Sequence, residues 1–176
     1  MTFDNYTIRL INEDEGDKFF RIMDSNRKRL EDYFAGTVAK TRTIEDTRAY
    51  VTEMGERIRN KTYLPFVIVD NTTGEFTGLV DVKNIDWNVP KAELGCFFDG
   101  NHTGKGLAER ALRSVLEHLE SEYKFIKLFL RTHEGNTTAR KLAGKCGFEL
   151  EGRIRKDYKT TGGEVIDCLY YGRIND

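Results

Sequence analysis

Hydrophobic positions alternate with polar ones in some segments of the chain and recur every three or four residues in others, which separates predicted strands from predicted helices. Residues 6–10 alternate and predict a short strand. Residues 14–34 carry apolar side chains at helical spacing, and this helix is expected to stop at Gly36. Residues 43–46 resemble a capping box with Asp in place of Glu, so a second helix is expected to run to about residue 61.

The middle of the chain predicts antiparallel strands. Residues 64–70 and 76–82 are apolar runs joined by a turn in which Gly74 takes the position that needs a positive φ. A further strand is predicted over residues 91–98. Its alternation sends Glu93, Gly95 and Phe97 to one face and Leu94, Cys96 and Phe98 to the other.

The period becomes helical over residues 107–119, and the pattern then predicts a strand at 126–131, a helix opening near Asn136 and closing strands at 148–158 and 165–171. This order predicts an α/β protein with a mixed sheet and helices on both faces. The 176 residues contain no Pro-rich linker and no break in composition, so one domain spanning 1–176 is expected.

Composition narrows the function classes. The formal net charge is −1, which argues against nucleic acid as a partner because that affinity needs a concentrated cationic surface. The sequence has no apolar run long enough for a membrane and no signal-peptide pattern, so we expect a cytoplasmic protein without membrane contact. Cys96, Cys146 and Cys168 have the spacing of neither a disulfide framework nor a metal site, and we interpret them as reduced core thiols.

The segment with the clearest chemistry is the glycine-rich turn at residues 99–108, between a predicted strand and a long helix. Gly104 and Gly106 let a ligand approach the backbone, and the unpaired N–H groups of the first helical turn suit a pyrophosphate. An ordinary capped turn would have the same pattern. Glu109 breaks the dinucleotide fingerprint, and the P-loop pattern is missing, so those two nucleotide motifs are excluded.

Residues 103–108, after the strand at 92–99, resemble motif A of the Gcn5-related N-acetyltransferases (GNAT). Residues 136–158 and 167–171 are similar to motif B and the tail of the ribosomal-protein N-acetyltransferase (RimJ/RimL) branch. The resemblance implies the GNAT fold, with a mostly antiparallel seven-stranded sheet that contains a splayed strand pair. It also implies acetyl-CoA as cosubstrate and no metal.

The resemblance assigns the acetyl-CoA site residue by residue. The family pattern Gln/Arg-x-x-Gly-x-Gly/Ala falls on Thr103, Gly104, Lys105, Gly106, Leu107 and Ala108. Gly106 and Ala108 match, whereas Thr103 departs from the pattern and should lose a side-chain contact. Backbone groups of Cys96, Phe97 and Phe98 are expected at the pantetheine arm and the thioester.

Two further residues are candidates for acetyl-CoA binding. Asn136 corresponds to an asparagine that hydrogen-bonds the pantetheine arm, and it would also be a favourable helix N-cap. Arg140, like Lys105, could face a phosphate or remain a solvated surface charge.

The catalytic groups are less completely specified. Ala143 and Ala139 stand where relatives carry a Tyr or a Ser acid, so the acid cannot be carried over from the family. Glu93 is the preferred general base, acting through water, although a structural hydrogen bond would equally explain it. Tyr158 is the candidate acid, with packing as its alternative role, and His133 is a third titratable candidate.

The acceptor implied by the branch is a primary amine, first of all the α-amine of a protein or peptide N-terminus. A polyamine or another small amine remains open, because acceptor choice lies in the N-terminal helices and the loop at 86–90, which carry no motif. A non-catalytic acyl-CoA-binding module also remains open because of Ala139 and Ala143. The resemblance implies a homodimer, for which an exposed C-terminal strand would offer an edge.

Overall fold

One eight-stranded sheet organises the chain in the computed structural model, which describes residues 1–102 and 106–175. Its order is β1-β2-β3-β4-β5-β6-β8-β7, and each neighbouring pair is antiparallel except the parallel pair of β5 and β6. The strands are β1 (Thr2–Phe3), β2 (Tyr6–Leu10), β3 (Leu64–Asp70), β4 (Phe76–Asp86), β5 (Lys91–Phe98), β6 (Lys127–Thr132), β7 (Glu149–Lys159) and β8 (Val165–Ile174). The predicted mixed sheet is confirmed, with one strand more than the seven expected.

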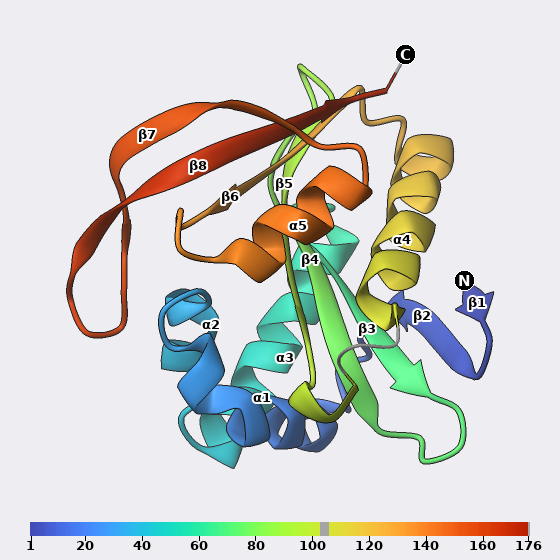
Figure 1. Cartoon of the computed structure of the whole chain (residues 1–176). Helices are drawn as coiled ribbons and strands as arrows, with labels where there is room; N and C mark the ends of the chain where they lie inside the picture. Colours follow the sequence, from blue (N-terminus) through green and yellow to red (C-terminus); the bar gives the residue numbers. More distant parts are fainter. Residues whose placement is uncertain (103–105, 176) are drawn as a thin grey trace.

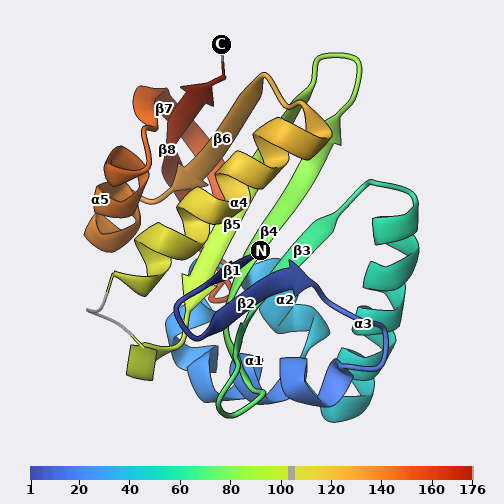
Figure 2. The ribbon, with the colours of Figure 1, turned by 90° about the vertical axis from the view of Figure 1, so that its right-hand side faces the viewer.

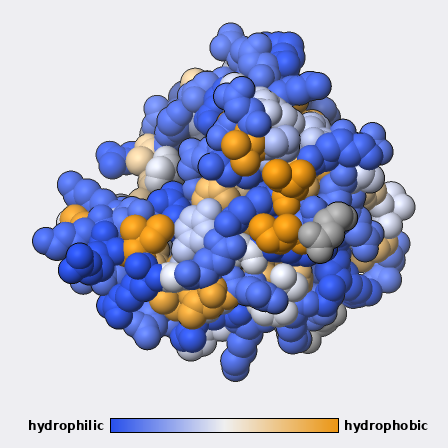
Figure 3. Space-filling model, turned by 90° about the horizontal axis from the view of Figure 1, so that it is seen from above, coloured by the Kyte–Doolittle hydropathy of each residue, from blue (hydrophilic) through white to orange (hydrophobic). Residues whose placement is uncertain are grey.

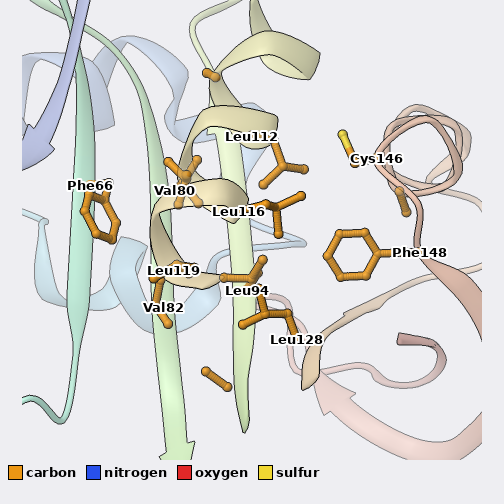
Figure 4. Close-up of a cluster of buried hydrophobic side chains, with 14 of the residues drawn as sticks. Phe66, Val80, Val82, Leu94, Leu112, Leu116, Leu119, Leu128, Cys146 and Phe148 are labelled. Carbon is orange, nitrogen blue, oxygen red and sulfur yellow. The ribbon is translucent and has the colours of Figure 1, made fainter. Parts of the chain in front are cut away.

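Helices cover both faces of this sheet (Figures 1 and 2). One face carries α1 (Gly16–Leu30), α2 (Ala35–Lys40) and α3 (Ile44–Arg59), and the other carries α4 (Leu107–Tyr123) and α5 (Thr137–Lys145). A short 3-10 turn (Gly100–His102) follows β5. Each face has its own buried cluster. In the cluster under α4, Leu112 and Leu116 lie with Phe148 beside Leu94 (Figure 4).

Several local predictions are confirmed and one is wrong. The Thr43 side chain accepts a hydrogen bond from the Asp46 backbone N–H at 3.1 Å and caps α3, and Gly74 has a φ of 72° in the turn between β3 and β4. Gly36 does not end the first helix, because α1 ends at Leu30 and Gly36 lies within α2. The extra helix begins where a distant side chain binds its backbone, and sequence periodicity carries no signal for such a contact.

The parallel strands β5 and β6 separate in the middle of the sheet. Their pairing runs from Lys91 with Lys127 to Glu93 with Phe129 and goes no further. Beyond that point β5 stays paired with β4, whereas β6 stays paired with β8. The two halves of the sheet therefore diverge and leave an opening between them, as the splayed strand pair predicts.

The C-terminal strand is not an edge, which corrects the expectation from the sequence. β8 lies between β6 and β7, so β7 forms that edge of the sheet. The two strands extend past the helices as a long hairpin (Figure 1). On the face seen in Figure 3, hydrophobic residues form small separate groups among hydrophilic ones. No described helix is long and apolar enough to cross a membrane.

Candidate active site

A pocket that is partly open to solvent lies where β5 and β6 separate. Both halves of the sheet contribute to it, and so do the turn between α1 and α2 and the helix α5. Residues that line it include Asp32, Tyr33, Phe34, Lys83, Glu93, Leu94, Gly95, Cys96, Leu130, Arg131, Thr132, His133, Asn136, Ala139, Ala143, Asp157, Tyr158 and Cys168. Glu93, Cys96, Asn136 and Tyr158, singled out from the sequence, thus meet at one place.

Glu93 lies at the point of separation and is only 5% exposed. Arg131 donates to both of its carboxylate oxygens, Nε to Oε1 at 3.2 Å and Nη2 to Oε2 at 2.9 Å. Asn84 Nδ2 also donates to Oε2, at 2.6 Å. Glu93 therefore faces the pocket as expected, and Oε1 keeps acceptor capacity beyond the one hydrogen bond it receives.

Glu93 belongs to a group of five charged side chains that spans the opening, here called the ion-pair cluster: Asp81, Lys83, Glu93, Arg131 and Asp157. Arg131 Nη1 donates to Asp157 at 2.8 Å, while Lys83 Nζ lies 3.6 Å from Asp81 Oδ2 and 4.0 Å from Glu93 Oε1. The nearby Asp81 carboxylate raises the pKa of Lys83 above its ordinary value, although burial opposes this. Lys83 is therefore a resident cation of the pocket at neutral pH.

The sequence analysis did not find Lys83, Arg131 or Asn84. Lys83 pairs directly with Glu93 across β4 and β5. Knowledge of the register of this hairpin would therefore have placed Lys83 beside Glu93. Asn84 reaches Glu93 from an irregularity in β4, where the register shifts between Lys83 and Asp86 and Asn84 has a φ of 49°. An extra residue of this kind in a strand has no sequence pattern of its own.

Tyr158 enters the pocket from β7. The register of β7 shifts between Ile154 and Tyr158, with Lys156 at a φ of 51°, and both Asp157 and Tyr158 line the pocket. The Tyr158 hydroxyl oxygen accepts a hydrogen bond from the Ala35 backbone N–H at 2.8 Å, which leaves the hydroxyl proton available for donation. Burial raises the pKa of Tyr158 above its ordinary value, so the phenol is protonated at neutral pH.

Asn136 and Arg140 lie at the first turn of α5. The Asn136 side chain accepts from the Ala139 backbone N–H at 3.1 Å, so the N-cap role is confirmed while Asn136 also lines the pocket. Arg140 donates to the Tyr171 hydroxyl at 3.2 Å and to the Glu134 carbonyl at 3.0 Å. These two contacts hold Arg140 against the protein.

The predicted cofactor loop leads into α4. Thr103, Gly104 and Lys105 lie outside the described residues, but Gly106 is the N-cap of α4 with a φ of 71° and open space where a Cβ would stand. Leu107 is buried, and Ala108 follows it in the first turn. The first N–H groups of this 17-residue helix have no intrahelical acceptor, which makes the N-terminus suitable for an anionic phosphate.

Backbone groups of Cys96, Phe97 and Phe98 were predicted to contact the pantetheine arm, and the structure places the side chains of these residues. Cys96 lines the pocket, and burial raises the pKa of its thiol to about 12, so it is not a thiolate nucleophile. Phe97 and Phe98 are not among the residues that line the pocket, because their side chains pack into the buried clusters on opposite faces of the sheet. Among residues 1–102 and 106–175, no group of three His, Cys, Asp or Glu side chains could hold a metal ion.

Residues 5–149 match the acetyltransferase (GNAT) domain family. This chain belongs to the GNAT acetyltransferase family. The family is described as an acetyltransferase domain, so the pocket at the splayed strands is the candidate active site of an enzyme.

Curated relatives of this GNAT chain are acetyltransferases by name, and two of the three reported names give different acceptors. An uncharacterized N-acetyltransferase p20 of Bacillus licheniformis is 29% identical over 60% of this chain and 59% of its own, so this chain spans less than two thirds of that relative. The ribosomal-protein-serine acetyltransferase of Escherichia coli is 26% identical over 58% of this chain and 56% of its own. The spermidine N(1)-acetyltransferase of Escherichia coli is 29% identical over 51% and 48%.

Solved structures confirm the GNAT fold over the full length of the chain. A ribosomal-protein-S5-alanine acetyltransferase from Vibrio fischeri superimposes with a TM-score of 0.89 at 21% identity, covering 100% of this chain and 96% of its own. RimL, a ribosomal L7/L12 alpha-N-protein acetyltransferase in complex with coenzyme A, gives a TM-score of 0.89 at 18% identity, covering 100% and 97%. At these identities the likeness concerns the fold.

Proposed function

We propose that residues 1–176 form one catalytic domain that transfers the acetyl group of acetyl-CoA to a primary amine, and that the acceptor is the α-amine of a protein or peptide N-terminus. The observation that carries this proposal is the pocket at the separation of β5 and β6. It joins Glu93 of one sheet half to Tyr158 of the other, next to the N-cap of α5.

Acetyl-CoA would bind on the side of α4 and α5. The N–H groups at the start of α4, beginning after Gly106, would hold the pyrophosphate with residues 103–108, and Arg140 could add a charge contact. The pantetheine arm would run past Asn136 into the opening, with backbone groups of Cys96, Phe97 and Phe98 near the thioester. The absence of a side chain at Gly106 fits this placement, since open space surrounds the position of its Cβ.

The acceptor would approach from the side of α1 and α2, where Glu93 faces. A neutral amine nitrogen attacks the thioester carbon, its proton passes through water to Glu93, and the C–S bond breaks as the tetrahedral intermediate collapses. Tyr158, with its hydroxyl proton available and its pKa raised by burial, would protonate the departing thiolate. The Arg131 and Asn84 donors would hold the Glu93 side chain in place between turnovers.

Several observations support a peptide N-terminus as the acceptor. Two of the structures that superimpose with a TM-score of 0.89 carry names of ribosomal-protein acetyltransferases. The pocket is bordered by Asp32 and Tyr33 in the turn after α1, and Tyr33 is 43% exposed. A polyamine is the second candidate, because spermidine acetyltransferases are among the curated relatives.

The location that we propose for the protein is the cytoplasm. Its three cysteines are free thiols, which fits a reducing compartment.

The test is a release assay for the CoA thiol with purified protein, acetyl-CoA and a panel of amines. The panel contains peptides with free N-terminal serine or alanine, the same peptides with blocked N-termini, spermidine and free lysine. We expect the free-terminus peptides to give the highest kcat/KM and the blocked peptides to give none. Higher kcat/KM with spermidine would move the assignment to the polyamine acceptor.

A further inference from the structure

Asp32 lines the pocket without a bonded partner. It lies in the turn between α1 and α2 and is exposed at the border of the pocket. Within residues 1–102 and 106–175, the other Asp, Glu, Lys and Arg side chains of the lining belong to the ion-pair cluster, in which each has an ion-pair partner. An unpartnered carboxylate at the mouth of a pocket is a candidate contact for a cationic ligand.

The turn that carries Asp32 is held on both sides by the β7–β8 hairpin. Before Asp32, the carbonyl of Glu31 accepts from the Thr161 backbone N–H at 3.4 Å and from the Thr161 hydroxyl. After Asp32, the backbone N–H of Ala35 donates to the Tyr158 hydroxyl at 2.8 Å. These contacts fix the backbone around Asp32, so its carboxylate has a defined place at the opening.

Asp32 and the proposed base lie at different depths of the pocket. Glu93 is 5% exposed, whereas Asp32 is exposed and its neighbour Tyr33 is 43% exposed. Burial raises the pKa of Tyr158 and the Asp32 carboxylate adds to the rise, so Asp32 lies within electrostatic range of the proposed acid. An acceptor whose reacting nitrogen lies at Glu93 would therefore have another part of its structure near Asp32.

The charges around the pocket indicate which group suits this position. The ion-pair cluster contains three carboxylates and two cations, and Asp32 adds a fourth carboxylate, so two negative charges are in excess. The reacting nitrogen must be neutral when it attacks, and it then balances none of this charge. A second group of the acceptor that stays cationic would balance it, whereas an acidic group would be repelled.

We propose that Asp32 binds a second positive charge of the acceptor, so that the enzyme prefers peptides with a lysine or arginine shortly after the N-terminal residue. This inference rests on the proposed function and deepens it by naming the acceptor sequence that the pocket mouth selects. A polyamine would bring the same second charge in its distal amine. The amine panel of the release assay distinguishes these two sources.

Peptide pairs that differ in one charge test the proposal on the unmodified protein. Lysine at position two, three or four of a serine peptide is compared with norleucine, which keeps the carbon chain of lysine and lacks its charge. At low ionic strength, kcat/KM should be about 2- to 5-fold higher with lysine at one or more of these positions, the usual range for an exposed ion pair. The preference should disappear in about 1 M salt, which screens exposed charges.

Three variants connect the preference to Asp32. Asp32→Asn removes the charge and should make kcat/KM equal for the lysine and norleucine peptides, through a change in the peptide KM, while the KM of acetyl-CoA stays at the wild-type value. Asp32→Lys should reverse the preference and favour glutamate at the same position. Asp14→Asn is the matched control, because Asp14 is another exposed aspartate and does not line this pocket, so the lysine preference should persist.

Equal kcat/KM of the wild-type protein for lysine and norleucine at all three positions would overturn the proposal. So would an Asp32→Asn protein with native circular dichroism that keeps the wild-type preference, because another group would then bind the charge. These outcomes leave the proposed function intact, since both peptides are acetylated. Acetylation of neither peptide would overturn the proposed function, and this inference with it.

Discussion

At the scale of single residues, the two proposed catalytic groups approach the pocket from different halves of the sheet. Glu93 comes from β5 and is fixed by three hydrogen bonds, from Arg131 and Asn84. Tyr158 comes from β7 and is fixed by the Ala35 backbone N–H. Both side chains are thus held in one orientation before substrate binds, which limits the reorganisation needed for proton transfer.

The first residue-scale prediction concerns Glu93. Glu93→Gln keeps the size of the side chain and removes its basicity, so kcat should fall by about 10²- to 10⁴-fold, the usual range for a positioned acid or base. The loss should be smaller at high pH, where more of the acceptor is already neutral. Steady-state kinetics as a function of pH, with acetyl-CoA affinity from calorimetry, provide the measurement.

Glu151→Gln is the matched control. Glu151 forms an ion pair with Lys127 at 2.6 Å and does not line the pocket, so this substitution should leave kcat within about twofold of the wild type. Near-wild-type kcat in Glu93→Gln across the pH range would remove Glu93 from proton transfer, and Tyr158 and His133 would then be the next residues to test.

The second residue-scale prediction concerns Tyr158. Tyr158→Phe removes the hydroxyl, and kcat should fall by about 10²- to 10⁴-fold with little change in acetyl-CoA affinity. Because burial raises the pKa of Tyr158, the wild-type phenol should stay protonated, and no activity should be lost to its ionisation below about pH 10.

A change of leaving group distinguishes acid catalysis by Tyr158 from packing. An acetyl thioester of a more acidic thiol needs less protonation as it departs, so Tyr158→Phe should lose less activity with that donor than with acetyl-CoA. Tyr170→Phe, which alters a tyrosine that stacks on Phe129 and does not line the pocket, is the control. An equal loss with both donors would assign Tyr158 a structural role.

The residue scale also shows where sequence reasoning reaches its limit. The alternation of residues 91–98 was enough to place Glu93 and Gly95 on one face, and the buried clusters confirm the two faces. The contacts of Glu93 with Arg131 and Asn84 could not be predicted in this way. They depend on the diverging strands β5 and β6 and on an irregularity in β4, which are tertiary features. The orientation of Tyr158 depends in the same way on the register shift in β7.

At the scale of elements, the start of α4 is the feature on which the proposed acetyl-CoA binding depends. Gly106 adopts a φ of 71° at its N-cap, a conformation that glycine tolerates and other residues adopt with strain. The helix behind it is long and well packed, with Ala111, Leu112, Val115 and Leu119 almost fully buried. A rigid helix of this kind keeps its first N–H groups fixed relative to the pocket.

The element-scale prediction is that Gly106→Trp abolishes acetyl-CoA binding, because the indole would occupy the path of the pyrophosphate. Gly106→Ala is the matched control, since it introduces the same backbone strain but only one methyl group into open space. Calorimetry should show strong binding in Gly106→Ala and none in Gly106→Trp. Undiminished affinity in a folded Gly106→Trp protein would show that the site lies elsewhere.

Elements with strong local signals were predicted well, and those defined by distant contacts were not. The capping side chain of Thr43 and the turn at Gly74 act within a few residues, and both appear as predicted. The helix α2 was missed, since its first N–H is bound by Tyr158, 123 residues away. The sequence also did not indicate the order of β7 and β8 in the sheet, because either strand could have formed its edge.

At the scale of the whole molecule, the β7–β8 hairpin offers a surface for self-association. β7 is the edge of the sheet, and Leu150, Ile154 and Val165 are 56%, 39% and 52% exposed on this hairpin. An exposed apolar edge strand is a template for pairing with another chain. We therefore propose a homodimer formed through this hairpin.

Sedimentation at micromolar concentration should give the mass of a dimer for the wild type and of a monomer for Ile154→Lys. Val89→Lys, which changes another exposed apolar residue away from the hairpin, should remain dimeric. A wild-type protein that sediments only as a monomer would contradict this assembly.

The central claim is that the protein transfers an acetyl group from acetyl-CoA to an amine nitrogen in the pocket between β5 and β6. Its most direct test is mass spectrometry of the products after the wild-type protein is incubated with acetyl-CoA labelled with deuterium in the acetyl group and a peptide with a free N-terminal serine. The account predicts labelled acetyl on the α-nitrogen in equal amount to the CoA released, with both products strongly reduced in Glu93→Gln. Acetyl-CoA that binds but yields no acetylated peptide, spermidine or lysine would contradict it.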